Sequence, residues 1–205
     1  MGPADLVVLV ADASMKAAIE GLLSRPADLG ILQFSHQVIV HPNRDPGCRL
    51  QGHELLRTMQ RTFRFALLMF DLDGSGAVGL DRAEVEAEAE SKLFASGWKD
   101  RSAVIVIAPE LEIWVWADSP WVDRVLGWQG RQPALRPWLM SEGMAFNELG
   151  KPADPKAAME KALRLARKPR SSSLYRELAE NVNIERCLDP AFLKLKATLR
   201  NWFGK

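Results

Sequence analysis

Residues 65–76, Phe65-Ala-Leu-Leu-Met-Phe-Asp-Leu-Asp-Gly-Ser-Gly76, set the expected architecture of this chain. The first six of them form a continuous apolar run, which is typical of a strand buried on both faces of a parallel sheet. Asp71 and Asp73 follow where the strand ends, and glycines with a serine form the turn behind them. The segment therefore predicts a central strand that delivers two carboxylates to one edge of a sheet.

Outward from this segment, further strands alternate with helical patterns. Apolar runs predict strands at 6–10, 37–40 and 103–107. Apolar residues at helical spacing predict helices over about 12–23, 53–63, 80–95, 154–167, 173–182 and 190–202. Residues 41–47 contain two prolines and a glycine, and we expect a loop there. The alternation predicts an α/β fold, a mostly parallel four-stranded sheet flanked by helices, with a helical C-terminal extension.

Composition bounds both size and partners. A chain of 205 residues can form one substantial core, so we expect an α/β domain at 1–150 and a helical extension at 151–205 packed on it. The formal net charge of +1 predicts no overall attraction to polyanions, so nucleic acid would bind at a local patch. No run approaches the roughly 18 apolar residues of a membrane span, and Cys48 and Cys187 form no metal-binding pair. We expect a cytoplasmic protein without a membrane partner.

The carboxyl ends of parallel strands meet at one edge of a sheet, where ligands bind. Four segments fall there: Ala11-Asp12, residues 41–47, residues 71–76, and Pro109 to Glu112. Each of the four carries at least one carboxylate. Asp12 suits either a helix N-cap or a metal ligand. Glu110 and Glu112 suit either the solvated first turn of a helix or the same metal site. The sequence predicts an acidic active edge.

The loop at 41–47 also faces this edge in the expected topology. It carries His41 and Arg44, which we expect to bind substrate, with the guanidinium of Arg44 contacting phosphate.

Residues 71–76 admit three interpretations. A calcium-binding helix–loop–helix would need a glutamate at position 12 of its loop, where Arg82 stands, and a helix before the loop. A haloacid-dehalogenase-type phosphatase has a similar strand followed by Asp-x-Asp-Gly, in which Asp71 would be the nucleophile and Asp73 the general acid or base. That motif usually opens its domain, whereas here two strands and a helix precede it.

The third interpretation uses the whole order of elements. A strand, a helix, a strand, a strand ending in Asp-x-Asp, a helix and a fourth strand together resemble the Toprim fold of topoisomerases, primases and overcoming-lysogenization-defect nucleases. Pro109-Glu-Leu-Glu-Ile-Trp114 is similar to a segment that follows the fourth strand in small stand-alone Toprim-like proteins of phage-defence loci, the RloB-type proteins among them. The C-terminal pattern, Pro169-Arg-Ser-Ser-Ser173, Cys187-Leu-Asp-Pro-Ala-Phe192 and Trp202-Phe203, is similar as well. The chain more distantly resembles the small Toprim-like component of a methylation-associated defence system.

This resemblance implies a Mg²⁺ or Mn²⁺ site for phosphodiester chemistry, because hard carboxylate oxygens hold an ion that polarises phosphate and activates water. Asp71 and Asp73 would hold the ion, Glu112 would complete the site, and Asp12 would be a further ligand. The implied protein is a nuclease of an anti-phage system, with nucleic acid and other subunits of that system as partners.

One departure keeps a second function open. The family has a glutamate at the end of its first strand, where this chain has Ala11, with Asp12 one residue along. A lysine that some of these nucleases carry after the fourth strand is absent from the sequence. The alternative is therefore a non-catalytic binding subunit of a defence complex on a degenerate Toprim-like scaffold.

Overall fold

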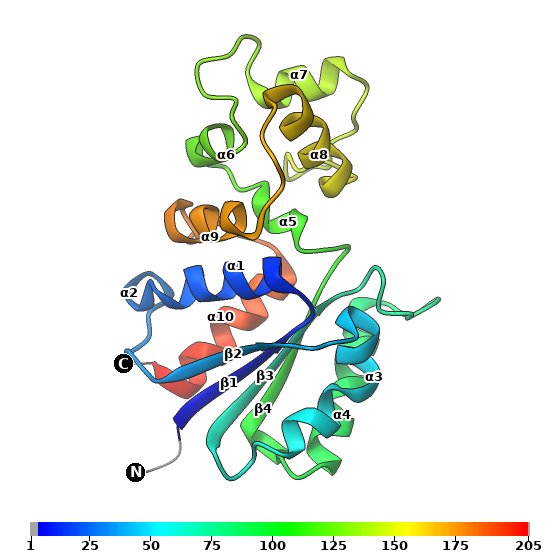
Figure 1. The fold of residues 1–205 in the computed structure, drawn as a ribbon, viewed down its shortest axis with the longest axis vertical. Helices are drawn as coiled ribbons and strands as arrows, with labels where there is room; N and C mark the ends of the chain where they lie inside the picture. Colours follow the sequence, from blue (N-terminus) through cyan, green and yellow to red (C-terminus); the bar gives the residue numbers. More distant parts are fainter. Residues whose placement is uncertain (1–3, 205) are drawn as a thin grey trace.

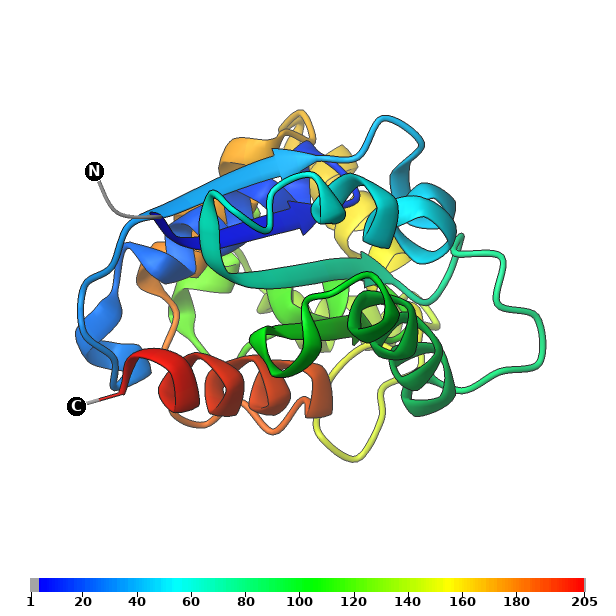
Figure 2. The same cartoon turned by 90° about the horizontal axis from the view of Figure 1, so that it is seen from below.

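The computed structural model describes residues 4–204. Its centre is a four-stranded sheet formed by β1 (Ala4–Val10), β2 (His36–Val40), β3 (Phe63–Asp71) and β4 (Ser102–Ile107). All neighbouring strands are parallel, and their order is β2-β1-β3-β4 (Figure 2). The predicted α/β class and four-stranded sheet are confirmed, and the sheet is wholly parallel.

Helices cover both faces of the sheet because its central strands are apolar on both sides (Figure 1). One face carries α1 (Ala13–Leu23) and α10 (Pro190–Phe203), with the short α2 (Pro26–Leu29) between them. The other carries α3 (Arg44–Arg57) and α4 (Arg82–Ala95). Alternate residues of β3 show the division: Phe65 stacks on Trp202 of α10 at 4.7 Å between ring centroids, whereas Leu68 lies against Gly52 of α3.

A second layer of helices lies beyond α1, on the side of α1 that faces away from the sheet (Figure 1). It contains α5 (Glu112–Val115), α6 (Pro120–Val125), α7 (Leu135–Ser141), α8 (Pro155–Ala166) and α9 (Ser172–Asn181). Helix α9 packs along α1, which joins this layer to the sheet. The predicted domain limit at residue 150 lies in the connection between α7 and α8. No helix in residues 4–204 combines the length and apolar character that a membrane crossing requires.

The start of α3 differs from the sequence expectation. Residues 44–47 were predicted to be loop and the helix to begin near residue 53, but α3 begins at Arg44 and ends at Arg57. Pro46 stands in the first turn, where its missing N–H removes no helical hydrogen bond. Gly47 is required there because a Cβ would overlap the imidazole of His41. The proline and glycine that suggested a loop instead fit a tightly packed helix start.

The outer edge of β4 is closed by side chains. On that edge the amides of Val104 and Val106 donate to Glu90 Oε1 at 3.1 Å and Glu86 Oε1 at 3.0 Å. Lys194 of α10 bridges the two glutamates, at 3.0 Å from Glu86 Oε2 and 2.7 Å from Glu90 Oε1. The free amides of this edge strand are thus satisfied by α4, and α10 fixes the glutamates that satisfy them.

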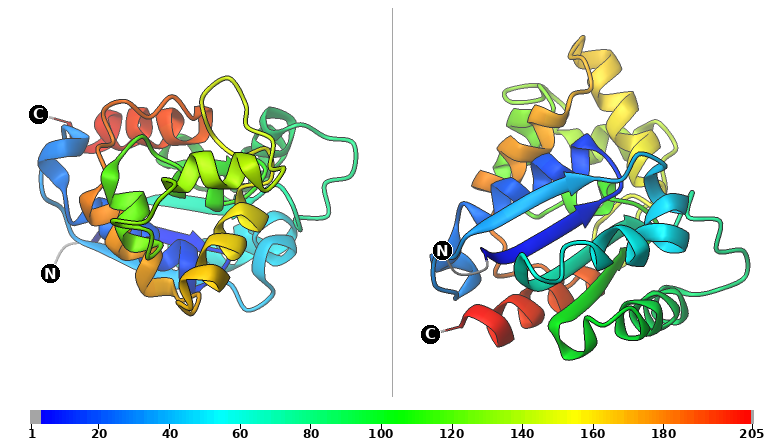
Figure 3. Two further views of the ribbon diagram at one scale, coloured as in Figure 1. Left: turned by 90° about the horizontal axis from the view of Figure 1, so that it is seen from above. Right: turned by 60° about the horizontal axis from the view of Figure 1, so that its bottom comes forward.

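Residues 72–81 form a loop that extends away from the body of the molecule between β3 and α4 (Figure 3). A strand and not a helix precedes it, so the calcium-binding helix–loop–helix interpretation is wrong. The loop's base is fixed by two backbone hydrogen bonds, from Leu72 N to Ile107 O at 2.8 Å and from Asp73 N to Pro109 O at 2.9 Å. These bonds hold the end of β3 beside the chain that leaves β4.

Candidate metal centre

A cleft lies over the carboxyl ends of β1 and β3, where the strand order reverses. The chain goes from β1 to β2 on one side, then returns past β1 to β3 and β4 on the other. Open parallel sheets bind ligands at such a reversal. Carboxylates outnumber cations among the residues lining it: Asp12, Asp45, Asp71, Asp73, Glu110, Glu112 and Asp154 against Arg44, Lys156 and Arg170. An excess of carboxylates in a confined space favours a bound cation.

Asp71 is the last residue of β3 and stands at the centre of the acidic group. Its amide donates to Asp45 Oδ1 at 2.8 Å, which fixes the carboxyl of Asp45 beside it. The Oδ1 atom of Asp71 is buried and has no hydrogen-bond partner within the described part of the chain. Burial, and after it the carboxylate of Asp45, raises the pKa of Asp71 well above its ordinary range. A buried carboxylate oxygen without a donor is costly unless a ligand satisfies it.

Glu110 and Glu112 come from the segment that leads from β4 into α5, and each is held by groups from α8, α9 and their connection. Lys156 Nζ donates to Glu110 Oε2 at 2.9 Å. Arg170 and Tyr175 both donate to Glu112 Oε1, and Glu112 is only 2% exposed. In residues 4–204 the other oxygen of each glutamate accepts no hydrogen bond.

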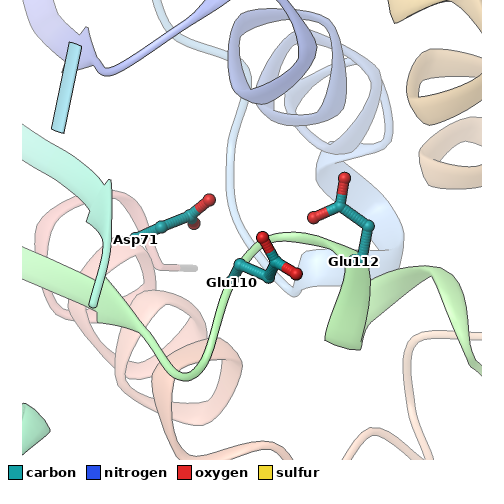
Figure 4. A group of neighbouring side chains, drawn as sticks. All are labelled: Asp71, Glu110 and Glu112. Atoms are coloured by element: carbon teal, nitrogen blue, oxygen red, sulfur yellow. The ribbon is translucent and has the colours of Figure 1, made fainter. Parts of the chain in front are cut away.

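Asp71, Glu110 and Glu112 each place a carboxylate oxygen within 4.8 Å of the other two (Figure 4). The three side chains converge from the end of β3, from the segment before α5 and from the first residue of α5. Three hard oxygen ligands at this spacing suit a divalent cation such as Mg²⁺ or Mn²⁺. Together with the unpartnered Oδ1 of Asp71, these three carboxylates could hold a divalent cation.

The other predicted site residues lie at different distances from this group. Asp73 is exposed and lines the cleft, but it does not join the three carboxylates. Asp12 also lines the cleft, and its Oδ1 caps α1 by accepting from Met15 N at 2.8 Å. Its expected role as an N-cap is confirmed, and a role as ligand stays a prediction.

The two predicted substrate-binding residues are placed unequally. Arg44 is exposed at the mouth of the cleft and forms no ion pair in the described residues. His41 is 4% exposed and does not line the cleft, and its Nδ1 accepts from Asn43 N at 3.1 Å. Only Arg44 is therefore in position to contact a substrate.

Backbone amides add positive potential to the same cleft. The first turns of α1, α8 and α9 all contribute residues to its lining, among them Ser14, Pro155 and Ser172. The N-terminus of a helix carries partial positive charge and favours anions. The cleft therefore combines a carboxylate group for a cation with surroundings that suit an anionic ligand.

Several residues of the site were not selected from the sequence. Glu110 matched the pattern of a solvated first turn, and Asp45 lay in an expected loop. Lys156 and Tyr175 belong to helices and Arg170 to the connection between them, all far along the chain from Asp71, so no local pattern connects them to it. The available signal for Glu110 was its spacing of two residues from Glu112, just beyond a strand.

Comparisons of this chain with family models, with curated proteins and with solved structures found no match in any of the three.

Proposed function

We propose that this protein binds Mg²⁺ or Mn²⁺ through Asp71, Glu110 and Glu112 and hydrolyses phosphodiester bonds as a nuclease. The observation that carries the proposal is the buried, unpartnered Oδ1 of Asp71 within a group of three carboxylates. Nothing else in the described chain satisfies that oxygen, and a divalent cation would. When bound, such an ion polarises the phosphate and lowers the pKa of water.

The chain's own residues supply the remaining functions. Arg44, which lines the cleft with an unpaired guanidinium, contacts the substrate phosphate. The first turns of α1 and α9 stabilise negative charge on the substrate at the same place. Asp73 and Asp12 line the cleft beyond the three ligands and approach the bound substrate or its water. An anti-phage role, with other defence proteins as partners, rests on the sequence resemblance to Toprim-like defence proteins.

The position of Asp71 favours this function over the phosphatase. A nucleophilic carboxylate must be ionised to attack an anionic phosphate, whereas burial and the like charge of Asp45 raise the pKa of Asp71 and no cation among the described side chains pairs with it. Absence of phosphoenzyme formation with a generic phosphate ester is the expected result.

A non-catalytic binding subunit is the second candidate, and Ala11 favours it. Ala11 follows β1 and is buried where the resembling nucleases have a glutamate, so it brings no carboxylate to the cleft. In this alternative the cleft binds metal or nucleic acid without cleaving it, and activity resides in a partner protein.

Calorimetric titration with Mn²⁺ and Mg²⁺ tests the proposal first. We expect the wild type to bind, Asp71→Asn to lose binding, and Asp73→Asn to retain most of it because Asp73 lies outside the three-carboxylate group. Single- and double-stranded DNA and RNA are then incubated with the same proteins. Metal-dependent cleavage lost in Asp71→Asn supports the nuclease, binding without cleavage supports the second candidate, and a wild type that binds neither ion refutes both metal-dependent forms.

A further inference from the structure

Glu112 is held by a closed set of hydrogen bonds. Tyr175 Oη and Arg170 Nη2 both donate to Glu112 Oε1, and Arg170 Nε donates to Tyr175 Oη at 3.1 Å. Each of the three side chains thus contacts the other two. Because both donors use the same oxygen, Oε2 remains without a hydrogen-bond partner in residues 4–204, and it is this side of the carboxylate that is left for a cation.

The two donors are themselves fixed from opposite directions. The ring of Tyr175 is 2% exposed and lines a small apolar cavity together with Leu111, on the side of α9 that packs toward α1. Arg170 approaches from the solvent side, just before α9, and its Nη1 donates to Glu160 of α8 at 3.1 Å. The position of Oε1 is therefore set by the packing of α9 on one side and by α8 on the other.

The segment from Glu110 to Glu112 links this packing to the cleft. Leu111 lines both the apolar cavity and the cleft, while the glutamates on either side of it belong to the carboxylate group. Displacement of α9 would release Glu112 from its two donors. Hydrogen-bond donors that orient a ligating carboxylate typically change metal affinity by about 10- to 100-fold when removed.

We propose that Tyr175 and Arg170 are positioning residues of the metal centre, which fix Glu112 so that Oε2 is presented to the ion. The helical extension thereby becomes part of the metal site, because the site is incomplete without α9. This inference rests on the proposed metal site and adds the residues that organise it.

Tyr175→Phe tests the inference most cleanly, since it removes the hydroxyl and keeps the buried ring. Calorimetry with Mn²⁺ alone should show about tenfold weaker binding than in the wild type. A double-mutant cycle with Glu112→Gln then separates positioning from general stability. If Tyr175 acts through Glu112, the effect of Tyr175→Phe on affinity disappears in the Glu112→Gln background. An equal loss in both backgrounds would mean that the hydroxyl only stabilises the fold, and would overturn the inference.

Tyr175 also provides a spectroscopic test, because it is the chain's single tyrosine. Isotope-labelled tyrosine reports on this one residue, and its NMR signal should shift on titration with Mg²⁺ along a curve that gives the dissociation constant found by calorimetry. The shift should be absent in Asp71→Asn. A signal that does not respond while the protein binds Mg²⁺ would contradict the coupling.

The outcomes distinguish this inference from the proposed function. A wild type that binds no divalent ion refutes both, whereas a wild type and a Tyr175→Phe variant that bind equally well refute only the positioning role. Should Tyr175→Phe fail to fold, Arg170→Lys repeats the test. Lysine keeps the positive charge but lacks the planar guanidinium, whose Nε and Nη2 donate to Tyr175 and Glu112 at the same time. Weaker Mn²⁺ binding is again expected, and unchanged binding again refutes the inference.

Discussion

Asp71→Asn should make the metal-free protein more stable while it abolishes metal binding. Asp71 is partly buried and its Oδ1 is buried without a partner in the described residues, among the carboxylates of Asp45, Glu110 and Glu112. Asparagine has nearly the same shape and no charge. The substitution therefore removes a repulsion that only a bound cation would otherwise relieve.

The expected gain in stability of the metal-free protein follows from the distances between the carboxylates. Two unit charges at 4.8 Å repel by about 3.5 kcal/mol at an effective dielectric constant of about 20. Lys156 and Arg170 offset much of the glutamate charge, so a gain of about 1 to 3 kcal/mol is expected. For a chain of this length that corresponds to a rise in Tm of about 2 to 10 °C.

The assay is thermal unfolding in EDTA from about pH 4 to about pH 8, for the wild type, Asp71→Asn and the exposed control Asp73→Asn. Because the folded protein raises the pKa of Asp71, the penalty in the wild type is absent below the unfolded pKa and grows as the pH rises toward the folded pKa. The advantage of Asp71→Asn should therefore be small at the acidic end and largest at neutral pH.

Addition of metal should reverse the order. Mg²⁺ or Mn²⁺ at about 1,000 times its dissociation constant stabilises a binding-competent protein by about 4.1 kcal/mol, which exceeds the expected advantage of Asp71→Asn, and Asp71→Asn should gain little. An Asp71→Asn variant that is less stable than the wild type in EDTA at neutral pH, or equally stabilised by metal, would refute the electrostatic reasoning. Asp73→Asn should leave the stability in EDTA nearly unchanged.

Three further results are expected. Arg44→Gln should weaken nucleic-acid binding without changing Mn²⁺ affinity, and the slope of log affinity against log salt concentration should fall by about one. An unchanged slope would count against a contact between Arg44 and a phosphate. Gly47→Ala should lower stability by about 1 to 3 kcal/mol in urea unfolding, because the new Cβ meets the buried ring of His41, and a neutral result would contradict the packing described. Glu86→Ala should lower the free energy of unfolding in urea by about 2 to 4 kcal/mol, since it leaves the buried amide of Val106 without an acceptor. A loss of stability below about 0.5 kcal/mol would show that this hydrogen bond adds little.

The parts of the fold that depend on local patterns could be predicted from the sequence. Continuous apolar runs identified β1, β3 and β4, because a strand covered on both faces has few polar positions to obscure it. The edge strand β2 is mostly exposed and was identified from its three apolar residues, Val38 to Val40. Asp12 was recognisable as an N-cap for the same local reason. The start of α3 was not predictable in this way, because Gly47 is selected by the ring of His41 and not by loop formation.

The candidate site was only partly predictable. Asp71 and Glu112 could be selected because each follows a strand, and strand ends in a parallel sheet meet at one edge. The donors that hold Glu112 could not, because Arg170 and Tyr175 lie 58 and 63 residues along the chain. Their contact is created by the packing of α9 on α1, which is a tertiary event without a local sequence signal.

The closed outer edge of β4 limits how copies of this protein can associate through their sheets. Indefinite growth by strand addition needs two open edges on every copy, one to receive a neighbour and one to offer to the next. Here Glu86 and Glu90 already occupy the amides at one edge, with Lys194 fixing both, so within residues 4–204 β2 is the one strand through which another sheet can be joined. Such joining stops at a two-fold pair, and the native fold is thereby protected from polymerising into fibres by sheet extension.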